Sequence, residues 1–155
     1  MEAEIQGYLT EFGIISGDIH SAIQGLNNEG ASWHPLQEGT NSIYAILSHV
    51  MSADNFWVRQ VINGEVVQRD REAEFRASGN LMELLTRWEK AWTEIEVILG
   101  KLTYAQLSEV RSPPFRAERK ESVTIQWIIL HLITHHATHL GHIQLTRQLW
   151  EQQHR

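Results

Sequence analysis

Hydrophobic residues recur at intervals of three and four along four long segments of the chain. An α-helix turns by about 100° per residue, so this spacing places the apolar side chains on one side of a helix. The segments span residues 3–27, 41–63, 79–99 and 122–151. The third has the most regular stripe, formed by Leu81, Leu84, Leu85, Trp88, Trp92, Ile95 and Leu99. The pattern predicts four amphipathic helices, each of which buries its apolar side against the others.

Polar residues and glycines mark the ends of these segments. Thr40 or Asn41 can cap the second helix, and Ser122 or Thr124 can open the fourth. Their side chains accept hydrogen bonds from the free amides at a helix start. Gly100 closes the third helix, since glycine follows the last turn of many helices.

The connecting segments contain no long apolar stripe. Residues 28–40 are rich in turn formers, residues 64–78 are highly charged and predict a solvated loop, and residues 103–108 begin with a capping box that predicts a single helical turn. We find no strand pattern longer than a few residues and no internal repeat. The pattern predicts an all-α fold, a four-helix bundle with long crossover connections, in a single domain that spans residues 1–155.

The composition of the 155 residues fits a folded protein and narrows its partners. Apolar residues make up 42% and charged residues 21%. The net charge of -6 argues against nucleic acid or an anionic membrane as the partner, because both need a basic surface. No stretch reaches the roughly 18–20 apolar residues of a membrane span. The first residues, MEAEIQGYLTEFGII, carry acids where a signal peptide has bases, so we predict a cytoplasmic protein.

Five histidines lie in the stretch HLITHHATHLGHI of the fourth segment. With His135 at 0° on a helical wheel, His131 lies at about -40°, His139 at about +40° and His142 at about -20°. These four form a narrow ridge at the edge of the apolar side. His136, at about +100°, points into the apolar side and is predicted to make a buried hydrogen bond. Because burying several imidazoles without partners is costly, the ridge favours a metal site over five core histidines.

The spacing of the ridge suits a metal ion. Two histidines one turn apart can bind the same ion, and this spacing occurs twice, as His131/His135 and as His135/His139. A third ligand must come from another helix, because one helix cannot surround an ion. His49 is the best donor, since alanines one turn away on either side leave space beside it. Three imidazoles and an open fourth position are typical of catalytic sites, and imidazole accepts zinc, nickel, iron or copper.

Other polar and aromatic residues are weaker candidates. Asp54 lies about 140° from His49 around the second helix, so we expect it to cap or pair locally. Trp33 and His34 precede a proline in the connecting segment, where one of them can lie at the edge of a site. The chain has no cysteine, which excludes disulfides, thiolate ligands and a cysteine nucleophile.

The sequence resembles the DinB-like (DinB/YfiT-like) superfamily of bacterial metalloproteins over nearly its whole length. The resemblance rests on SHVMSADNFWVRQVINGE in the second segment and HLITHHATHLGHI in the fourth. It implies a four-helix bundle, usually a homodimer, with a metal triad at His49, His135 and His139. The implied cofactor is a divalent metal ion, zinc or nickel most commonly and iron in some cases. His142 stands where many relatives have glutamine, and His131 is an additional histidine.

Better-understood members of this superfamily transfer a low-molecular-weight thiol to an electrophile. The resemblance therefore implies a metal-dependent thiol S-transferase in detoxification or stress, whose partners are a small-molecule thiol and an electrophilic substrate. His142 and His131 are candidates for proton transfer or for contacts that orient the ligands. Two alternatives stay open. One is a metal-dependent hydrolase, although the ridge offers no Asp or Glu as general base, and the other is a non-catalytic metal-binding stress protein.

Overall fold

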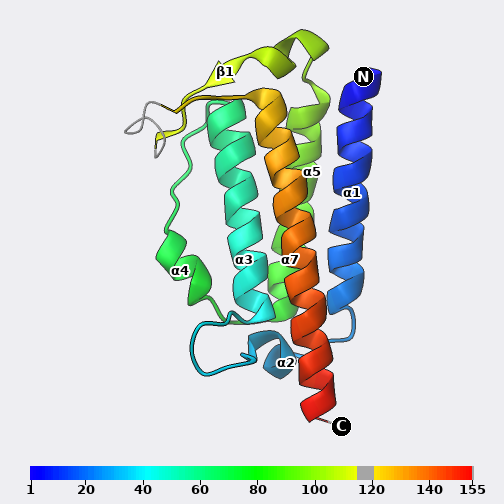
Figure 1. The fold of residues 1–155 in the computed structure, drawn as a ribbon, viewed down its shortest axis with the longest axis vertical. Coiled ribbons are helices and arrows are strands. Elements are labelled where there is room, and N and C mark those ends of the chain that lie inside the picture. The colour runs from blue at the N-terminus through cyan, green and yellow to red at the C-terminus, as the bar shows by residue number, and fades with distance from the viewer. Residues whose placement is uncertain (115–120, 155) are drawn as a thin grey trace.

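The computed structural model describes residues 1–114 and 121–154, which form a helical bundle (Figure 1). The long helices are α1 (Ala3–Ile23), α3 (Ile43–Asp54) with its continuation η1 (Asn55–Ile62), α5 (Leu81–Gly100) and α7 (Ile125–Gln153). The shorter elements are α2 (Asn28–Ser32), α4 (Arg71–Phe75), η2 (Tyr104–Ser108), β1 (Val110–Arg111) and β2 (Val123–Thr124). The all-α class predicted from the sequence is confirmed, although α1 ends at Ile23 rather than at residue 27.

The direction of the helices explains the long connections. In Figure 1, α1 and α7 descend while α3 and α5 ascend. Because α3 and α5 are parallel, residues 63–80 must return along the length of the bundle, and they carry α4 on its outside next to α3. At the end where α7 begins, β1 and β2 pair antiparallel, with Val110 opposite Thr124. None of the described helices has the length and apolarity needed to cross a membrane.

Side-chain caps fix where the helices that carry the site begin. The hydroxyl of Ser42 accepts a hydrogen bond from the amide of Ala45 at 3.1 Å, so α3 begins just after the predicted caps. The hydroxyl of Thr124 accepts from the amide of Trp127 at 3.1 Å and opens α7 as predicted. Each cap of this kind stabilises a helix by about 1 kcal/mol. The capping box of η2 is also present.

The buried side chains form two apolar clusters along the bundle, with a polar layer between them. The first includes Ile5, Phe12, Leu99, Ile125, Ile128 and Leu132, and the second includes Ile19, Ile43, Leu47, Val50, Leu84 and Ile143. His136 is completely buried and contacts both clusters, with ring centroids 4.5 Å from Phe12 and 5.6 Å from Trp88. The indole nitrogen of Trp88 donates to the hydroxyl of Ser16 at 3.3 Å. Each polar group in this layer therefore needs a partner inside the core.

Two connecting segments contain structure that the sequence pattern did not predict. Residues 28–40 include α2, where Gly30 packs so closely on α7 that a Cβ would lie 2.7 Å from the indole nitrogen of Trp150. Residues 64–78 were predicted as a solvated loop, which is wrong for α4. Asp70 caps this helix through the amide of Ala73, and Glu74 is only 7% exposed.

The second predicted helix is continuous, but its last part is wider than an α-helix. From Asn55 to Ile62 the backbone bonds as a π-helix, and the amide of Asn63 bonds the carbonyl of Val58 at 3.0 Å. Wider turns of this kind are rare and often occur beside functional sites. Here the π-helix carries Phe56 and Trp57, which line a cavity next to the histidines.

Candidate metal centre

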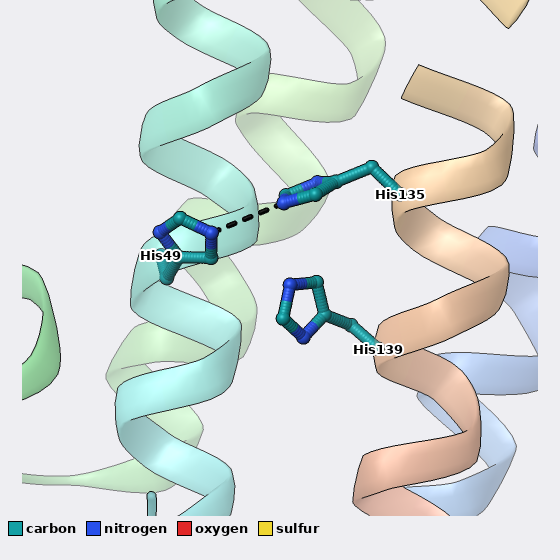
Figure 2. Close-up of side chains that lie close together, drawn as sticks. All are labelled: His49, His135 and His139. Carbon is teal, nitrogen blue, oxygen red and sulfur yellow. Dashed lines mark hydrogen bonds between the residues drawn. The ribbon is translucent and has the colours of Figure 1, made fainter. Parts of the chain in front are cut away.

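Three histidines from two helices converge between α3 and α7 (Figure 2). His49 comes from α3, whereas His135 and His139 lie one turn apart on α7. The Nε2 atoms of His49 and His135 are 3.0 Å apart, and the ring of His139 lies 5.2 Å from that of His49 and 4.5 Å from that of His135. One ring nitrogen from each residue lies within 4.8 Å of the other two. The structure thus brings together the three predicted ligands, in an arrangement that can hold a metal ion.

The separations fit a tetrahedral ion. Metal–nitrogen bonds of about 2.0–2.1 Å place neighbouring nitrogens of a tetrahedral site about 3.3 Å apart. The 3.0 Å between His49 and His135 is close to this value, and one nitrogen of His139 lies within 4.8 Å of both. Three imidazoles without thiolate or carboxylate suit a borderline divalent ion, and a tetrahedral ion held by three residues would have a fourth position for another ligand.

Two of the three imidazoles are held in the neutral form that a metal requires. Burial, followed by the neighbouring histidines His139 and His49, lowers the pKa of His135 from 6.5 to about 3. Burial, followed by His49 and His142, lowers the pKa of His139 to about 4. At neutral pH both rings therefore keep a lone pair for an ion.

The third imidazole is oriented by a carboxylate. Oε2 of Glu74 on α4 lies 2.8 Å from Nδ1 of His49. Burial alone would raise the pKa of Glu74, but hydrogen bonds from Arg69, Ser52 and His49 outweigh it and hold that pKa below its usual value. Since the ionised carboxylate can only accept, Nδ1 of His49 donates, and Nε2 keeps its lone pair toward His135. Carboxylate–histidine pairs of this kind orient ligands in many metal sites.

The crossover segment holds Glu74 and covers His49. Glu74 accepts from Ser52 at 2.6 Å and from Nε of Arg69 at 2.8 Å, so its charge is balanced in its buried position. The ring of Phe75 stacks on that of His49 with centroids 4.7 Å apart. The sequence pattern did not identify Glu74 or Arg69 as residues of the site. The available signal was weak, an Asp70 cap followed by one helical turn ending in Phe75, within a segment whose many charges favour a loop.

Asp54 has a different role from the predicted local one. Both of its carboxylate oxygens lie 2.9 Å from Nε2 of His136, 82 residues away on α7. The expectation that Asp54 caps or pairs locally is wrong, because α3 turns this residue toward the core. The buried hydrogen bond predicted for His136 is confirmed. His136 is therefore tied to Asp54 and does not join the triad, although it is adjacent to His135 in sequence.

His131 and His142 extend the ridge on either side of the triad. His131 stacks on Trp127 with ring centroids 4.8 Å apart and contacts Trp57 at 5.5 Å. His142 is exposed, and its Nδ1 lies 3.4 Å from Nδ1 of His139. This long hydrogen bond engages one nitrogen of His139 and leaves the other for an ion.

Two cavities meet the triad from different sides. The first, the arginine cavity, has a volume of about 670 Å³ and is lined by His49, His135, Phe56, Trp57, Arg69 and Arg71, among others. The second, the leucine cavity, has a volume of about 620 Å³, and its lining includes His139, His142, Trp33, Leu36, Leu145 and Leu149. Trp33 thus lies at the edge of the site, as its position in a loop allowed, and each cavity gives access to part of the triad.

Comparisons with known proteins agree with this architecture. A conserved protein from Enterococcus faecalis superposes with a TM-score of 0.75 at 14% identity, covering 96% of this chain and 97% of its own. A protein from Streptococcus pneumoniae superposes with a TM-score of 0.70 at 11% identity, covering 98% and 92%. At these identities the likeness shows the fold alone.

No curated protein matches the sequence significantly. The family model of mycothiol-S-transferase (MST), in contrast, matches residues 16–152, which include all three triad histidines and both motifs named above. The resemblance to the DinB-like superfamily is therefore confirmed, and the chain belongs to the mycothiol-S-transferase family within it.

Proposed function

We propose that this protein is a metal-dependent transferase that joins a low-molecular-weight thiol, such as mycothiol, to an electrophile. The observation that carries the proposal is the convergence of His49, His135 and His139 between two cavities, in a chain that belongs to the mycothiol-S-transferase family. The three imidazoles are proposed as the metal ligands. The absence of cysteine is compatible with this role, because the reacting sulfur arrives with a substrate.

The residues of the site divide the work of such a reaction. A divalent ion on the three imidazoles would lower the pKa of a thiol and keep its sulfur as a thiolate. Glu74 keeps His49 in the tautomer whose Nε2 lone pair faces the place between the three rings where an ion would bind. The sulfur lone pair then forms the C–S bond, and the leaving group departs with the electron pair of the bond that breaks. When the electrophile is an alkene, no group leaves. The sulfur then bonds to one carbon of the double bond, and the neighbouring carbon takes up a proton.

The two flanking histidines are proposed to have different roles, with His142 accepting the thiol proton and His131 orienting the thiol. His142 is exposed and lies 3.4 Å from His139, so a proton accepted there can pass to solvent. His131 lines the arginine cavity and stacks on Trp127, a position that supports a role in orienting the bound thiol. A role in proton transfer for His142 agrees with the use of histidine near neutral pH.

The positions of the carboxylates argue against the hydrolase alternative, because none of those that the structure describes is available as a general base beside the triad. A hydrolytic site needs a general base beside the water that attacks. Among the described residues, neither cavity next to the triad has an Asp or Glu in its lining. The two buried carboxylates, Glu74 and Asp54, are both bonded to histidines. A thiol supplies the nucleophilic sulfur itself, so the transfer reaction does not need a carboxylate to activate water.

The ion and the oligomeric state are proposed from the family resemblance, whereas the domain and the location are proposed from the sequence pattern. We propose zinc or nickel as the ion, with iron as the next choice, since imidazole ligands accept all three. We also propose one domain over residues 1–155, a homodimer and a cytoplasmic location. Elemental analysis of the purified protein tests the identity of the ion, and its sedimentation in solution tests the homodimer.

A conjugation assay tests the function. Zinc- or nickel-loaded protein is mixed with mycothiol and monochlorobimane, and the fluorescent adduct is followed with time. His139→Ala should lower the rate by at least tenfold, while His20→Ala, an exposed histidine of α1, should not change it. Equal rates for the wild type and His139→Ala contradict the transferase. A melting temperature that falls on chelation, without any conjugation, would indicate the non-catalytic alternative.

A further inference from the structure

The two cavities beside the triad differ in the chemistry of their walls. We infer that they receive the two co-substrates separately: the leucine cavity binds an uncharged, apolar electrophile, and the arginine cavity binds the polar thiol. This inference rests on the proposed function and names the substrate class on each side of the site.

The lining of the leucine cavity carries no charged residue. It combines apolar side chains with neutral polar ones, and among the described residues that line it there is no Lys, Arg, Asp or Glu. A volume of about 620 Å³ lies within the usual range of roughly 300–1,000 Å³ for small-molecule sites. A charged ligand would lose its hydration here without gaining an ion pair, so the cavity selects an uncharged ligand.

Two leucines of this cavity expose apolar surface to water, which a bound ligand would cover. Leu36 is 63% exposed and Leu145 is 56% exposed, and both line the cavity together with Trp33 and Leu149. Apolar side chains that gather around one concave site usually mark a place where an apolar molecule binds. An aromatic or alkyl group of an electrophile is therefore the ligand that fits.

The loop that forms one wall of the leucine cavity is held by defined contacts. The hydroxyl of Thr40 accepts from the amide of Leu36 and donates to its carbonyl, both at 3.1 Å. Gly39 between them has φ +77°, a conformation that other residues rarely adopt. Trp33, at the start of the loop, packs on Trp150 of α7 with ring centroids 5.9 Å apart. The cavity is therefore a built feature of the fold.

The arginine cavity offers hydrogen-bond donors instead. Arg69, Arg71, Gln60 and His131 all belong to its lining, and no described acidic residue does. Arg69 is engaged by Glu74, but Arg71 is exposed at the start of α4. Low-molecular-weight thiols carry hydroxyl, amide or carboxylate oxygens along their length, which accept hydrogen bonds from such donors. The thiol therefore fits this cavity better than the charge-free one.

The position of the triad lets both co-substrates reach each other. His49 and His135 line the arginine cavity, whereas His139 lines the leucine cavity. A sulfur that enters beside the first two rings and a carbon that enters beside the third meet at the open position. There the C–S bond forms, the leaving group departs to solvent with the electron pair of the broken bond, and the proton of the thiol goes to solvent as well.

A matched pair of leucine substitutions tests this division. Leu145→Asp places a charge in the leucine cavity, and Leu130→Asp places one on the same helix outside both cavities. Leu130 is 47% exposed, close to the 56% of Leu145, so both variants should fold. The KM for monochlorobimane should rise at least tenfold in Leu145→Asp only, with the KM for mycothiol and the metal content unchanged.

A direct binding measurement keeps the inference separate from the reaction. The uncharged dye N-phenyl-1-naphthylamine, whose fluorescence rises in apolar sites, is titrated into each protein without thiol. It should bind the wild type and Leu130→Asp alike and bind Leu145→Asp at least tenfold more weakly. Failed conjugation with this dye pattern intact would refute only the proposed function. Equal dye affinity in all three proteins overturns the inference. It is also overturned if Leu145→Asp loses a dimer while its KM for monochlorobimane is unchanged, because the leucines would then contact a second copy of the chain.

Discussion

The carboxylate of Glu74 lies 2.8 Å from Nδ1 of His49, although the two residues belong to different helices and are 25 positions apart. This contact makes the crossover between α3 and α5 part of the candidate metal centre. Nδ1 of His135, by contrast, has no hydrogen-bond partner among the described residues. The orientation of His49 therefore depends on α4, and the site is sensitive to changes in a segment that contributes no ligand.

Removal of this carboxylate should weaken metal binding. Glu74→Ala frees the ring of His49 to rotate and to change tautomer, so the affinity for zinc should fall by about 10–100-fold. Competition with a chromophoric chelator measures the change. Glu72→Ala, on the same helix but 86% exposed, is the matched control and should bind like the wild type. Identical affinities in the two variants would mean that Glu74 does not orient the ligand.

Single replacements of the triad should remove most of the bound metal. His49→Ala, His135→Ala and His139→Ala each leave two imidazoles, which cannot hold an ion with the affinity of three. Metal content after dialysis, measured by elemental analysis, should fall well below one ion per chain, whereas His20→Ala keeps the wild-type content. Full occupancy in His49→Ala would refute the cross-helix site.

The spacing of residues on a helix accounts for what the sequence could predict. The stripes of the long helices follow a period of 3.6, and the same period places His135 and His139 on one ridge of α7. His49 was found because it interrupts an apolar face. Glu74 follows no such period, since one turn of helix is too short to show a stripe. Its burial depends on Arg69, five residues before it in the same connecting segment, and on Ser52, which lies on α3.

The role of Asp54 shows a second limit of prediction. The helical wheel correctly placed it away from His49, but it could not identify which helix lies on that side. The partner, His136, follows from the way α3 packs on α7, and this is a property of the folded chain. The π-helix from Asn55 to Ile62 likewise has no marker in the sequence, which predicts an ordinary helix up to Asn63.

The stability of the metal-free protein should decrease in acid. The pKa values of His135 and His139 are about 3 and 4 in the folded protein and 6.5 in an unfolded chain. Below pH 6.5 these two imidazoles therefore bind protons in the unfolded chain but stay neutral in the folded protein, so acid favours unfolding. The free energy of unfolding is therefore highest above about pH 6.5, decreases progressively as the pH falls from there toward pH 4 and 3, and levels off below these folded pKa values.

Thermal unfolding in the presence of a chelator measures this dependence. The melting temperature of the wild type should fall steadily from pH 7 to pH 4, and His135→Phe, which cannot be protonated at this position, should show a shallower fall. His20→Phe serves as the control, because His20 lies on the surface of α1. A melting temperature that is constant over this range would show that the two imidazoles do not resist protonation in the fold.

The buried pair of Asp54 and His136 should stabilise the bundle only as a pair. Asp54→Ala leaves the imidazole of His136, which has no exposed surface, without its partner, so the free energy of unfolding should fall by about 3–5 kcal/mol. The double variant Asp54→Leu with His136→Phe removes both polar groups and should recover most of that loss, because an apolar pair carries no desolvation cost. Urea unfolding measures both values, with Asp18→Ala as an exposed control that should change the free energy by less than about 0.5 kcal/mol. If Asp54→Ala proves as stable as this control, the core accommodates an unpaired imidazole, and the two residues are not linked as the contact implies.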